Sequence, residues 1–262
     1  MNRLSSIVER KSVEVAVAKL HAPIDSLESA LAGLPPCYDL TGSLSQPGGP
    51  TRVIAEIKRA SPAAGVIDGD ADAAELSRTY RDHGASAISV LTDSVGFAGS
   101  LDDLAAARRQ ADVPLLRKDF LIDSYQLVEA RCAGADAVLL IVAALSVGKL
   151  HELHAAAVDL GLEVLVEAHD EAEVEVALGI ADCRLVGLNS RNLGTLEVDL
   201  AVVERLAPMV GPEVAVVAES GIRSPADIAR LRASGLANFL VGEALVRSSD
   251  PGALLTELLG VG

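Results

Sequence analysis

The sequence predicts an α/β protein, and within that class a (β/α)8 barrel preceded by an N-terminal helical extension. From Val53 onward, short runs of branched apolar residues alternate with amphipathic segments of helical period, at intervals of roughly 20 to 30 residues. Half of the 262 residues are hydrophobic but only 2% are aromatic, which suits branched aliphatic side chains packed between helices and a sheet. An α/β barrel of this length commonly stays undivided, so we expect residues 51–262 to form one domain.

Residues 1–50 lie outside the alternation and are expected to form the extension and its connecting loop. The segment 4–20 has helical period, and residues 34–50 are rich in Pro, Gly and Ser. One face of the helix would consist of Leu4, Ile7, Val8 and Val15. The helix either covers the bottom or rim of the barrel or folds over the mouth of a site, and the pattern fits both.

Eight segments have the composition of buried strands. They are VIAEIK from 53, AISVLT from 87, PLLRKDF from 114, AVLLIV from 137, EVLVEA from 163, LVGLNS from 185, AVVAES from 215 and FLVGEA from 239. Strands separated by helices must pair in parallel, so eight such units indicate a closed barrel. The competing open, doubly wound sheet would place a GxGxxG turn after the first strand, and EIKRASPAAG lacks one.

Helical patterns fill the intervals between these strands. Clear examples cover 72–85, 100–111, 124–135 and 224–237. In the last of them, Ser224 is the expected N-cap, Pro225 suits the first turn, and Gly235 supplies the stop. Glycine recurs directly before two strands, at Gly84 and Gly134, where a helix is expected to end.

Polar residues gather near the ends of the predicted strands, on one face. Side chains of a barrel strand alternate between the interior and the helix layer, and active sites lie at the carboxyl ends of the strands. In the first strand Glu56 and Lys58 share a face, whereas the alternate face is wholly apolar. The same alternation predicts a ring of inward groups: Glu56, Lys58, Lys118, Glu167, Asn189, Arg191 and Glu219. Any one of them could be part of a structural ion pair, but buried charge is costly, so seven converging on one end predict a functional site.

Two later loops suggest a phosphate ester as the substrate. Barrels of this kind often bind phosphate with the loops after strands seven and eight, using backbone N–H groups and a short extra helix. Here those loops read ESGIRSP (219–225) and VGEALVRSSDP (241–251), with Gly221 and Gly242 allowing close approach of a ligand. The segment EALVRS could be the short helix, and Ser61 could add a hydroxyl.

Charge and cysteine content exclude several other classes. A net charge of −15 argues against nucleic acid or an anionic membrane as a partner. Three separated cysteines without a CxxC pair suggest neither disulfides nor zinc, which points to the reducing cytoplasm. No metal is required by any motif present, and His151 and His154 fit an amphipathic helix better than a metal site.

The motifs, taken in order, resemble the indole-3-glycerol phosphate synthase family. The resemblance covers nearly the whole chain through IVERKSVEV, IAEIKRASP, LRKDFLIDSYQ, DAVLLIVAAL, LVEAHDEAE, LNSRNLGTLEVDL, VAESGI and FLVGEALVR. It implies conversion of 1-(2-carboxyphenylamino)-1-deoxyribulose 5-phosphate to indole-3-glycerol phosphate, CO2 and water, without a cofactor. The implied partner is a small phosphorylated substrate, and the expected state is a monomer or weak homo-oligomer in the cytoplasm.

The resemblance also implies roles for individual residues. Lys118 would be the general acid of ring closure and Glu167 a general acid/base of dehydration, while Lys58 either donates a proton or binds the substrate carboxylate. Glu56 and Glu219 would tune the lysines, and Asn189 and Arg191 would orient the substrate. The aromatic ring would lie against Phe97, Phe120, Leu140 and Leu193, and the phosphate against Ser61, Ser220, Gly221, Gly242 and Glu243. Two departures, Ala63 and Glu243 in place of serine, affect only the expected phosphate end.

Overall fold

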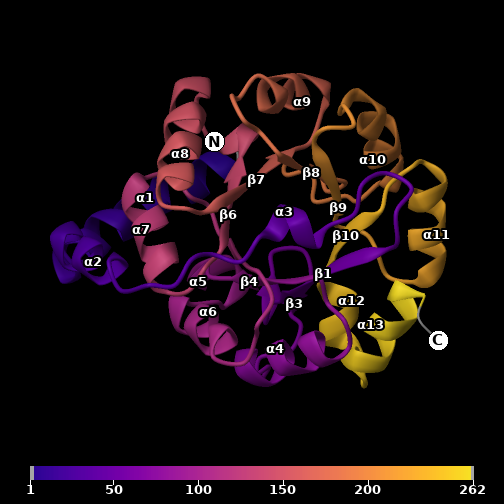
Figure 1. The fold of residues 1–262 in the computed structure, drawn as a ribbon, viewed down its shortest axis with the longest axis horizontal. Helices are drawn as coiled ribbons and strands as arrows, with labels where there is room; N and C mark the ends of the chain where they lie inside the picture. The colour runs from indigo at the N-terminus through magenta and orange to yellow at the C-terminus, as the bar shows by residue number, and fades with distance from the viewer. Residues whose placement is uncertain (1–2, 261–262) are drawn as a thin grey trace.

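A computed structural model describes residues 3–260, and the predicted barrel is present in it. Within that range eight parallel strands close into a ring in the order β1-β10-β9-β8-β7-β6-β5-β4, with helices around it (Figure 1). The strands are β1 (Arg52–Ile57), β4 (Ala87–Leu91), β5 (Leu115–Lys118), β6 (Ala137–Ile141), β7 (Glu163–Ala168), β8 (Leu185–Asn189), β9 (Ala215–Glu219) and β10 (Asn238–Val241). Each begins within a residue of its predicted segment, and most end within a residue of it, whereas β5 ends two residues early and β10 three.

The outer layer consists of helices that follow the strands. They are α4 (Ala73–Asp82), α6 (Leu101–Arg108), α7 (Ser124–Cys132), α8 (Val147–Asp159), α9 (Glu171–Leu178), α10 (Leu200–Leu206), α11 (Pro225–Ala233), and the pair α12 (Glu243–Arg247) and α13 (Pro251–Leu259). Ser224 caps α11 in a reciprocal capping box with Asp227, and Gly235 follows the helix with φ +88°. The sequence predicted Ser224 as the N-cap and Gly235 as the stop, whereas the reciprocal bond from Asp227 was not predicted.

Short elements in the loops were not predicted. They are the hairpin β2 (Ala60–Ser61) with β3 (Gly65–Val66), the single turn α5 (Ser94–Phe97), and the 3-10 turns η1 (Val142–Ala144) and η2 (Ala207–Met209). Each is too short for a period in the sequence to reveal it.

Two separate apolar clusters fill the barrel and its surroundings. One lies inside the ring and includes Ile54, Leu116 and Leu165, and the other lies between the ring and the helices and includes Val53 and Leu115. Neighbouring residues of one strand therefore belong to different clusters. This is the alternation on which the predicted inward ring of polar groups depends.

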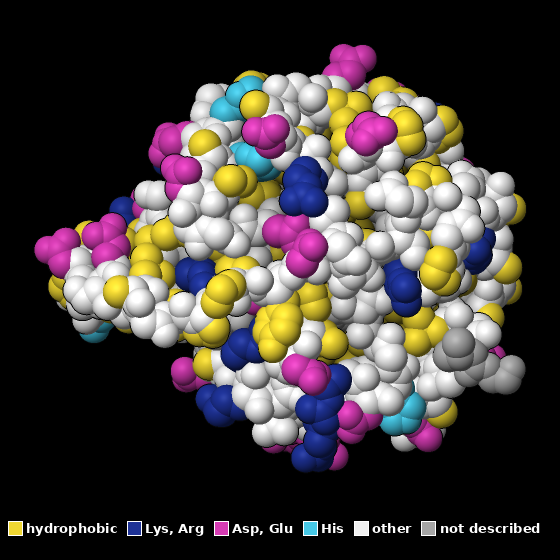
Figure 2. Space-filling view, viewed as in Figure 1, with side chains coloured by type: hydrophobic (Ala, Val, Ile, Leu, Met, Phe, Trp, Pro, Cys, Tyr) yellow, Lys and Arg dark blue, Asp and Glu magenta, His cyan; other side chains and the backbone are white. Residues whose placement is uncertain are grey.

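The extension consists of α1 (Arg3–His21), α2 (Ile24–Leu31) and α3 (Leu40–Ser43). The short α3, capped by Asp39, inserts Leu40 into the inner cluster of the barrel, and in Figure 1 it lies in front of the ring. The face of the barrel on which α3 lies carries interspersed basic and acidic side chains (Figure 2). Unlike α3, helix α1 reaches the opposite end of the barrel, where Arg3, Leu4 and Ile7 line the cavity described below. The structure thus places α1 at the mouth and α3 at the base.

Candidate active site

A cavity opens at the carboxyl ends of the strands, where the ring of polar groups was predicted. All seven predicted groups line it, and none lies elsewhere: Glu56, Lys58, Lys118, Glu167, Asn189, Arg191 and Glu219. Four of them are strongly buried, with Glu56 5% exposed, Glu167 2%, Asn189 7% and Glu219 1%. Because desolvated charge must be paired or used, their contacts decide what the cavity can do.

Lys118, the last residue of β5, lies between two glutamates. Its Nζ is 3.1 Å from Glu167 Oε2 at the end of β7 and 3.3 Å from Glu219 Oε2 at the end of β9. Burial alone would lower the pKa of Lys118, but Glu167, Glu219 and Glu56 together raise it well above its ordinary value. The lysine is therefore a charged donor at neutral pH.

The two glutamates beside Lys118 differ in ionisation. Burial raises the pKa of both, but Lys118 and His169 lower that of Glu167 to well below its ordinary range. For Glu219, burial and repulsion by Glu167 and Glu56 outweigh the attraction of Lys118 and raise the pKa to about 8. The surroundings thus favour the ionised form of Glu167 and the protonated form of Glu219 at neutral pH.

A second lysine lies at the end of the first strand. Lys58 Nζ donates to Glu56 Oε1 at 2.7 Å, and both side chains line the cavity. Gly242 makes room for this pair, because a Cβ at that position would collide with the Glu56 carboxyl group. Gly187 does the same for Glu219, whose carboxyl group would collide with a Cβ there. Gly242 was assigned to phosphate from the sequence, and the structure gives it this further steric requirement.

The predicted apolar wall is present with one correction. Phe97 and Phe120 form a tilted pair with ring centroids 6.5 Å apart, and Leu193 joins them along the cavity. Leu140 does not: it packs in the outer cluster, and its neighbours Leu139 and Ile141 line the cavity instead. All five residues of β6 are buried and apolar, so no polar residue marked which of them face inward.

The residues predicted to bind phosphate follow β1, β9 and β10, which are consecutive strands of the ring. Ser61, Ser220, Gly221, Gly242 and Glu243 all line the cavity. Ser220 and Gly221 both have positive φ, of 64° and 81°, and a serine in the left-handed region is a strained conformation of the kind found at ligand sites. The carboxylate of Glu243 accepts a hydrogen bond from Arg247 Nε at 3.0 Å, one turn along α12.

Asn189 and Arg191 are linked through the backbone. Asn189 Oδ1 accepts from the N–H of Arg191 at 3.0 Å, and Arg191 Nη1 donates to the carbonyl of Leu196 at 3.1 Å. Both side chains are therefore oriented by the loop after β8, on the side of the cavity where Leu193 also lies.

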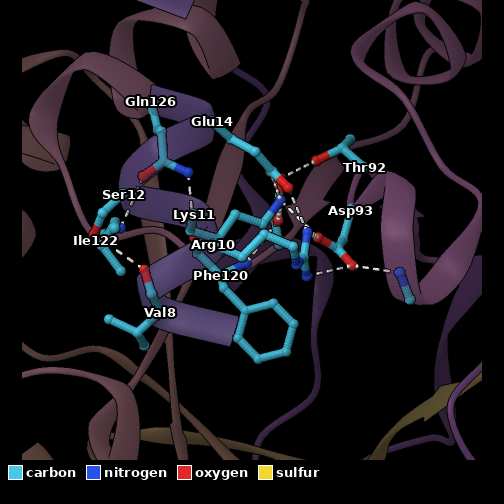
Figure 3. A network of polar contacts seen from close by, with 12 residues as sticks. Val8, Arg10, Lys11, Ser12, Glu14, Thr92, Asp93, Phe120, Ile122 and Gln126 are labelled. Atoms are coloured by element: carbon cyan, nitrogen blue, oxygen red, sulfur yellow. Dashed lines mark hydrogen bonds and ion pairs between the residues drawn. The ribbon is translucent and has the colours of Figure 1, made fainter. Parts of the chain in front are cut away.

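The extension helix contributes residues that the sequence analysis missed. Lys11 lies in the middle of the buried face of α1, 4% exposed, with its Nζ 2.7 Å from Asp93 (Figure 3). The same Nζ lies 2.8 Å from Asp119. Arg10 adds a contact of 2.9 Å to Asp93. The sequence did contain a sign of this contact, because Lys11 falls midway between Ile7 and Val15 on the apolar face of the helix. A cation on such a face needs a buried anionic partner.

His169 was also missed as part of the site. Its Nε2 lies 3.2 Å from Glu167 Oε1, and its Nδ1 lies 2.9 Å from Glu173 Oε2 on α9. Burial lowers the pKa of His169, but the two glutamates raise it to about 10. The sequence could have indicated this contact, because His169 comes two residues after Glu167 and side chains two residues apart along a strand point to the same side.

A closed (β/α)8 barrel with lysines and glutamates paired in a cavity at its carboxyl end defines an enzyme that uses acid–base chemistry on a small substrate. A family model described as indole-3-glycerol phosphate synthase matches residues 4–258. The chain is 46% identical over 258 residues to the indole-3-glycerol phosphate synthase of Laribacter hongkongensis, covering 97% of this chain and 98% of that protein. It is also 46% identical over 261 residues to that of Nocardioides sp., covering 100% and 99%. The chain belongs to the indole-3-glycerol phosphate synthase family.

Membership gives the activity that the sequence motifs implied. The chain is a carboxy-lyase of tryptophan biosynthesis, and its phosphorylated substrate is converted to indole-3-glycerol phosphate with release of CO2 and water. No helix among residues 3–260 is both long and apolar enough to cross a membrane.

More distant solved structures share the fold. Thiamine phosphate pyrophosphorylase from Pyrococcus furiosus superposes with a TM-score of 0.59 at 17% identity, covering 84% of this chain and 96% of that one. A mutant tryptophan synthase α-subunit from Pyrococcus furiosus gives 0.60 at 19% identity, covering 82% and 99%. At such identities the likeness confirms the barrel alone.

Proposed function

We propose that Lys118 is the general acid of the ring-closure step. The supporting observation is that Lys118 lies between Glu167 and Glu219 in the cavity. The two glutamates stabilise the charged ammonium group and fix its position. In this step the aromatic carbon attacks the substrate ketone, a C–C bond forms, and the ketone oxygen takes a proton from Lys118. Loss of CO2 then restores aromaticity.

Glu167 is proposed to act in the dehydration that follows. The hydroxyl formed by closure must leave as water, which requires one proton to be given and another to be removed. An ionised carboxylate 3.1 Å from the lysine that has just lost its proton is suited to accept one and pass it on. Glu219 and Glu56 tune the lysines, and Asn189 orients the substrate.

Substrate contacts are proposed for the remaining lining residues. Phe97, Phe120 and Leu193 would cover the anthranilate ring, with Leu139 and Ile141 in the place first assigned to Leu140. Arg191 would meet the carboxylate end. The phosphate would be bound by Ser61 and by the loops containing Ser220, Gly221, Gly242 and Glu243, the last through its backbone N–H, since its carboxylate is engaged by Arg247.

Lys58 has two candidate roles, as proton donor or as a group that binds the substrate carboxylate. The pairing with Glu56 at 2.7 Å, on a different strand from the Lys118 group, favours carboxylate binding. Lys58→Gln is then expected to raise KM about tenfold or more with a smaller change in kcat, because a binding contact common to substrate and transition state is lost. Indole fluorescence in metal-free buffer measures both constants. A fall in kcat with unchanged KM would assign the proton donation to Lys58 instead.

The remaining proposals concern organisation and context. Residues 1–50 are proposed to be an extension and 51–262 one catalytic domain, because the first strand of the closed ring begins at Arg52. A monomer or weak homo-oligomer in the cytoplasm is also proposed. The three cysteines, all free, suit a reducing compartment, and sedimentation at several concentrations would test the oligomeric state.

A further inference from the structure

His169 lies directly after β7, between two carboxylates from different elements. Its ring Nδ1 and its backbone N–H both contact Glu173 Oε2 at 2.9 Å, from the first turn of α9. Its Nε2 points to Glu167 Oε1 at 3.2 Å. The ring is thus fixed to α9 on one side and directed at the proposed acid/base on the other.

The histidine does not line the cavity, so it can reach the substrate only through Glu167. The two oxygens of Glu167 face different cations: Oε2 faces Lys118 at 3.1 Å and Oε1 faces His169 at 3.2 Å. The approach of His169 is an ion pair rather than an aligned hydrogen bond, because Nε2 has no hydrogen-bond partner among the described residues. The imidazolium therefore positions the Glu167 carboxylate by electrostatic attraction and does not occupy it with a hydrogen bond, which leaves the carboxylate free to accept a proton.

Comparison with Glu219 shows what the histidine adds. Both glutamates lie at strand ends beside Lys118, and both are almost fully buried. Glu219 has no second cation, and its Oε1 finds no hydrogen-bond partner within residues 3–260. Two buried carboxylates near one lysine compete to be the ionised one, and an imidazolium at Glu167 decides the competition.

We propose that His169, held by Glu173, is a positioning residue of the reaction that keeps Glu167 ionised and turned toward Lys118. The charged groups that face the ring are Glu167 from β7 and Glu173 from α9, and both favour the imidazolium. The inference rests on the acid/base role proposed above for Glu167. It adds a group outside the cavity that sets the protonation pattern inside it.

The test compares His169→Gln, Glu167→Gln and the double variant. Loss of a general acid/base lowers kcat by about 10²- to 10⁴-fold, and disturbing its position is expected to cost less, about tenfold, with KM unchanged within about twofold. In the Glu167→Gln background, His169→Gln should cause no further loss, since residues that act through one group are not additive. An additive loss, or an unchanged kcat for His169→Gln, would overturn the proposal.

The controls separate this proposal from the role of Glu167. Glu171→Gln removes another first-turn acid of α9, which pairs with Arg205 at 2.6 Å on the surface, and should leave kcat unchanged. Glu173→Gln should lower kcat in the same direction as His169→Gln. Normal turnover by Glu167→Gln would refute the role of Glu167 itself, whereas a loss there without a loss in the histidine variant refutes only the positioning role.

A measurement on the unaltered protein covers the case in which the variants do not fold. Ring ¹⁵N shifts report whether an imidazole carries one proton or two. At pH 8 one histidine, assigned by comparison with Glu173→Gln, should remain doubly protonated. A neutral His169 at pH 7 would contradict the proposal.

Discussion

Two lysines of this protein each lie between two carboxylates, one half-buried in the cavity and the other buried beneath α1. Lys118 lies between Glu167 and Glu219 in the cavity, and Lys11 lies between Asp93 and Asp119 beneath α1. In each case burial lowers the lysine pKa, and the neighbouring carboxylates more than restore it. The contacts around Lys11 are seen in Figure 3.

The two groups differ in how completely their charges are paired. Asp119 also contacts Arg117 at 3.2 Å, and Arg10 also contacts Asp93, so each aspartate has two cations. Burial raises the pKa of Asp119, but Arg117 and Lys11 lower it below its ordinary value. Glu219, with one cation, instead has a pKa raised to about 8. In the fully paired cluster the carboxylates are stabilised as anions, whereas in the cluster with fewer cations one carboxyl group favours its protonated form.

The largest expected effect is on turnover, from Lys118→Met. This variant should lose about 10²- to 10⁴-fold in kcat, because the proposed proton donor of ring closure is removed. The fold should persist, since Glu167 can take up a proton when the cation is gone, and the neighbouring Glu219 already favours its protonated form. Indole fluorescence and a thermal melt measure the two properties. Turnover close to that of the parent protein would end the general-acid assignment.

Lys11→Met should act on stability instead. Removing this cation leaves two buried aspartates short of a partner, which costs about 3–5 kcal/mol of unfolding free energy. Urea titration measures the change. KM should rise too, because α1 supplies Arg3, Leu4 and Ile7 to the cavity. A stability loss below about 1 kcal/mol would show that the cluster does not hold the helix.

The pH dependence of stability should differ between the clusters. A carboxyl group with a pKa raised from 4.5 to about 8 binds its proton more tightly when folded, so its contribution declines as pH rises between those values. Relative to Glu219→Gln, the parent protein should therefore lose melting temperature from pH 5 to pH 8.

Asp119, with a lowered pKa, contributes above about pH 4 and loses its contribution in stronger acid.

The control for that comparison is Glu213→Gln, an exposed glutamate just before β9. Its melting temperature should follow the parent protein across the same pH range. A parallel course for Glu219→Gln as well would mean that Glu219 is not the group that takes up the proton.

The smallest expected effect belongs to Lys19→Met. This lysine is on the same helix as Lys11 and contacts Asp123 at 2.8 Å, but its side chain is 45% exposed. Solvent-exposed pairs contribute about 0–1 kcal/mol, so unfolding free energy should barely change. A loss as large as that of Lys11→Met would mean that burial does not distinguish the two pairs.

Much of the barrel and of the cavity could be predicted because both are encoded in neighbouring residues. The alternation of strand and helix periods indicated eight units, and the side-chain alternation within β1, β5, β7, β8 and β9 pointed the polar residues inward. The same reasoning failed at Leu140, because every residue of β6 is apolar and buried. Where both faces of a strand are buried, no contrast marks the register.

The sequence by itself therefore determined the order of elements, the facing of polar residues and the family. Only the tertiary structure decided which charges meet: Lys118 with Glu167 across 49 residues of chain, Lys11 with two aspartates, and His169 with Glu167 and Glu173. The physical reason is that periodicity is a property of adjacent residues, whereas pairing and pKa depend on burial and on distances across the barrel. The division of protons between Glu167 and Glu219 is set by those distances.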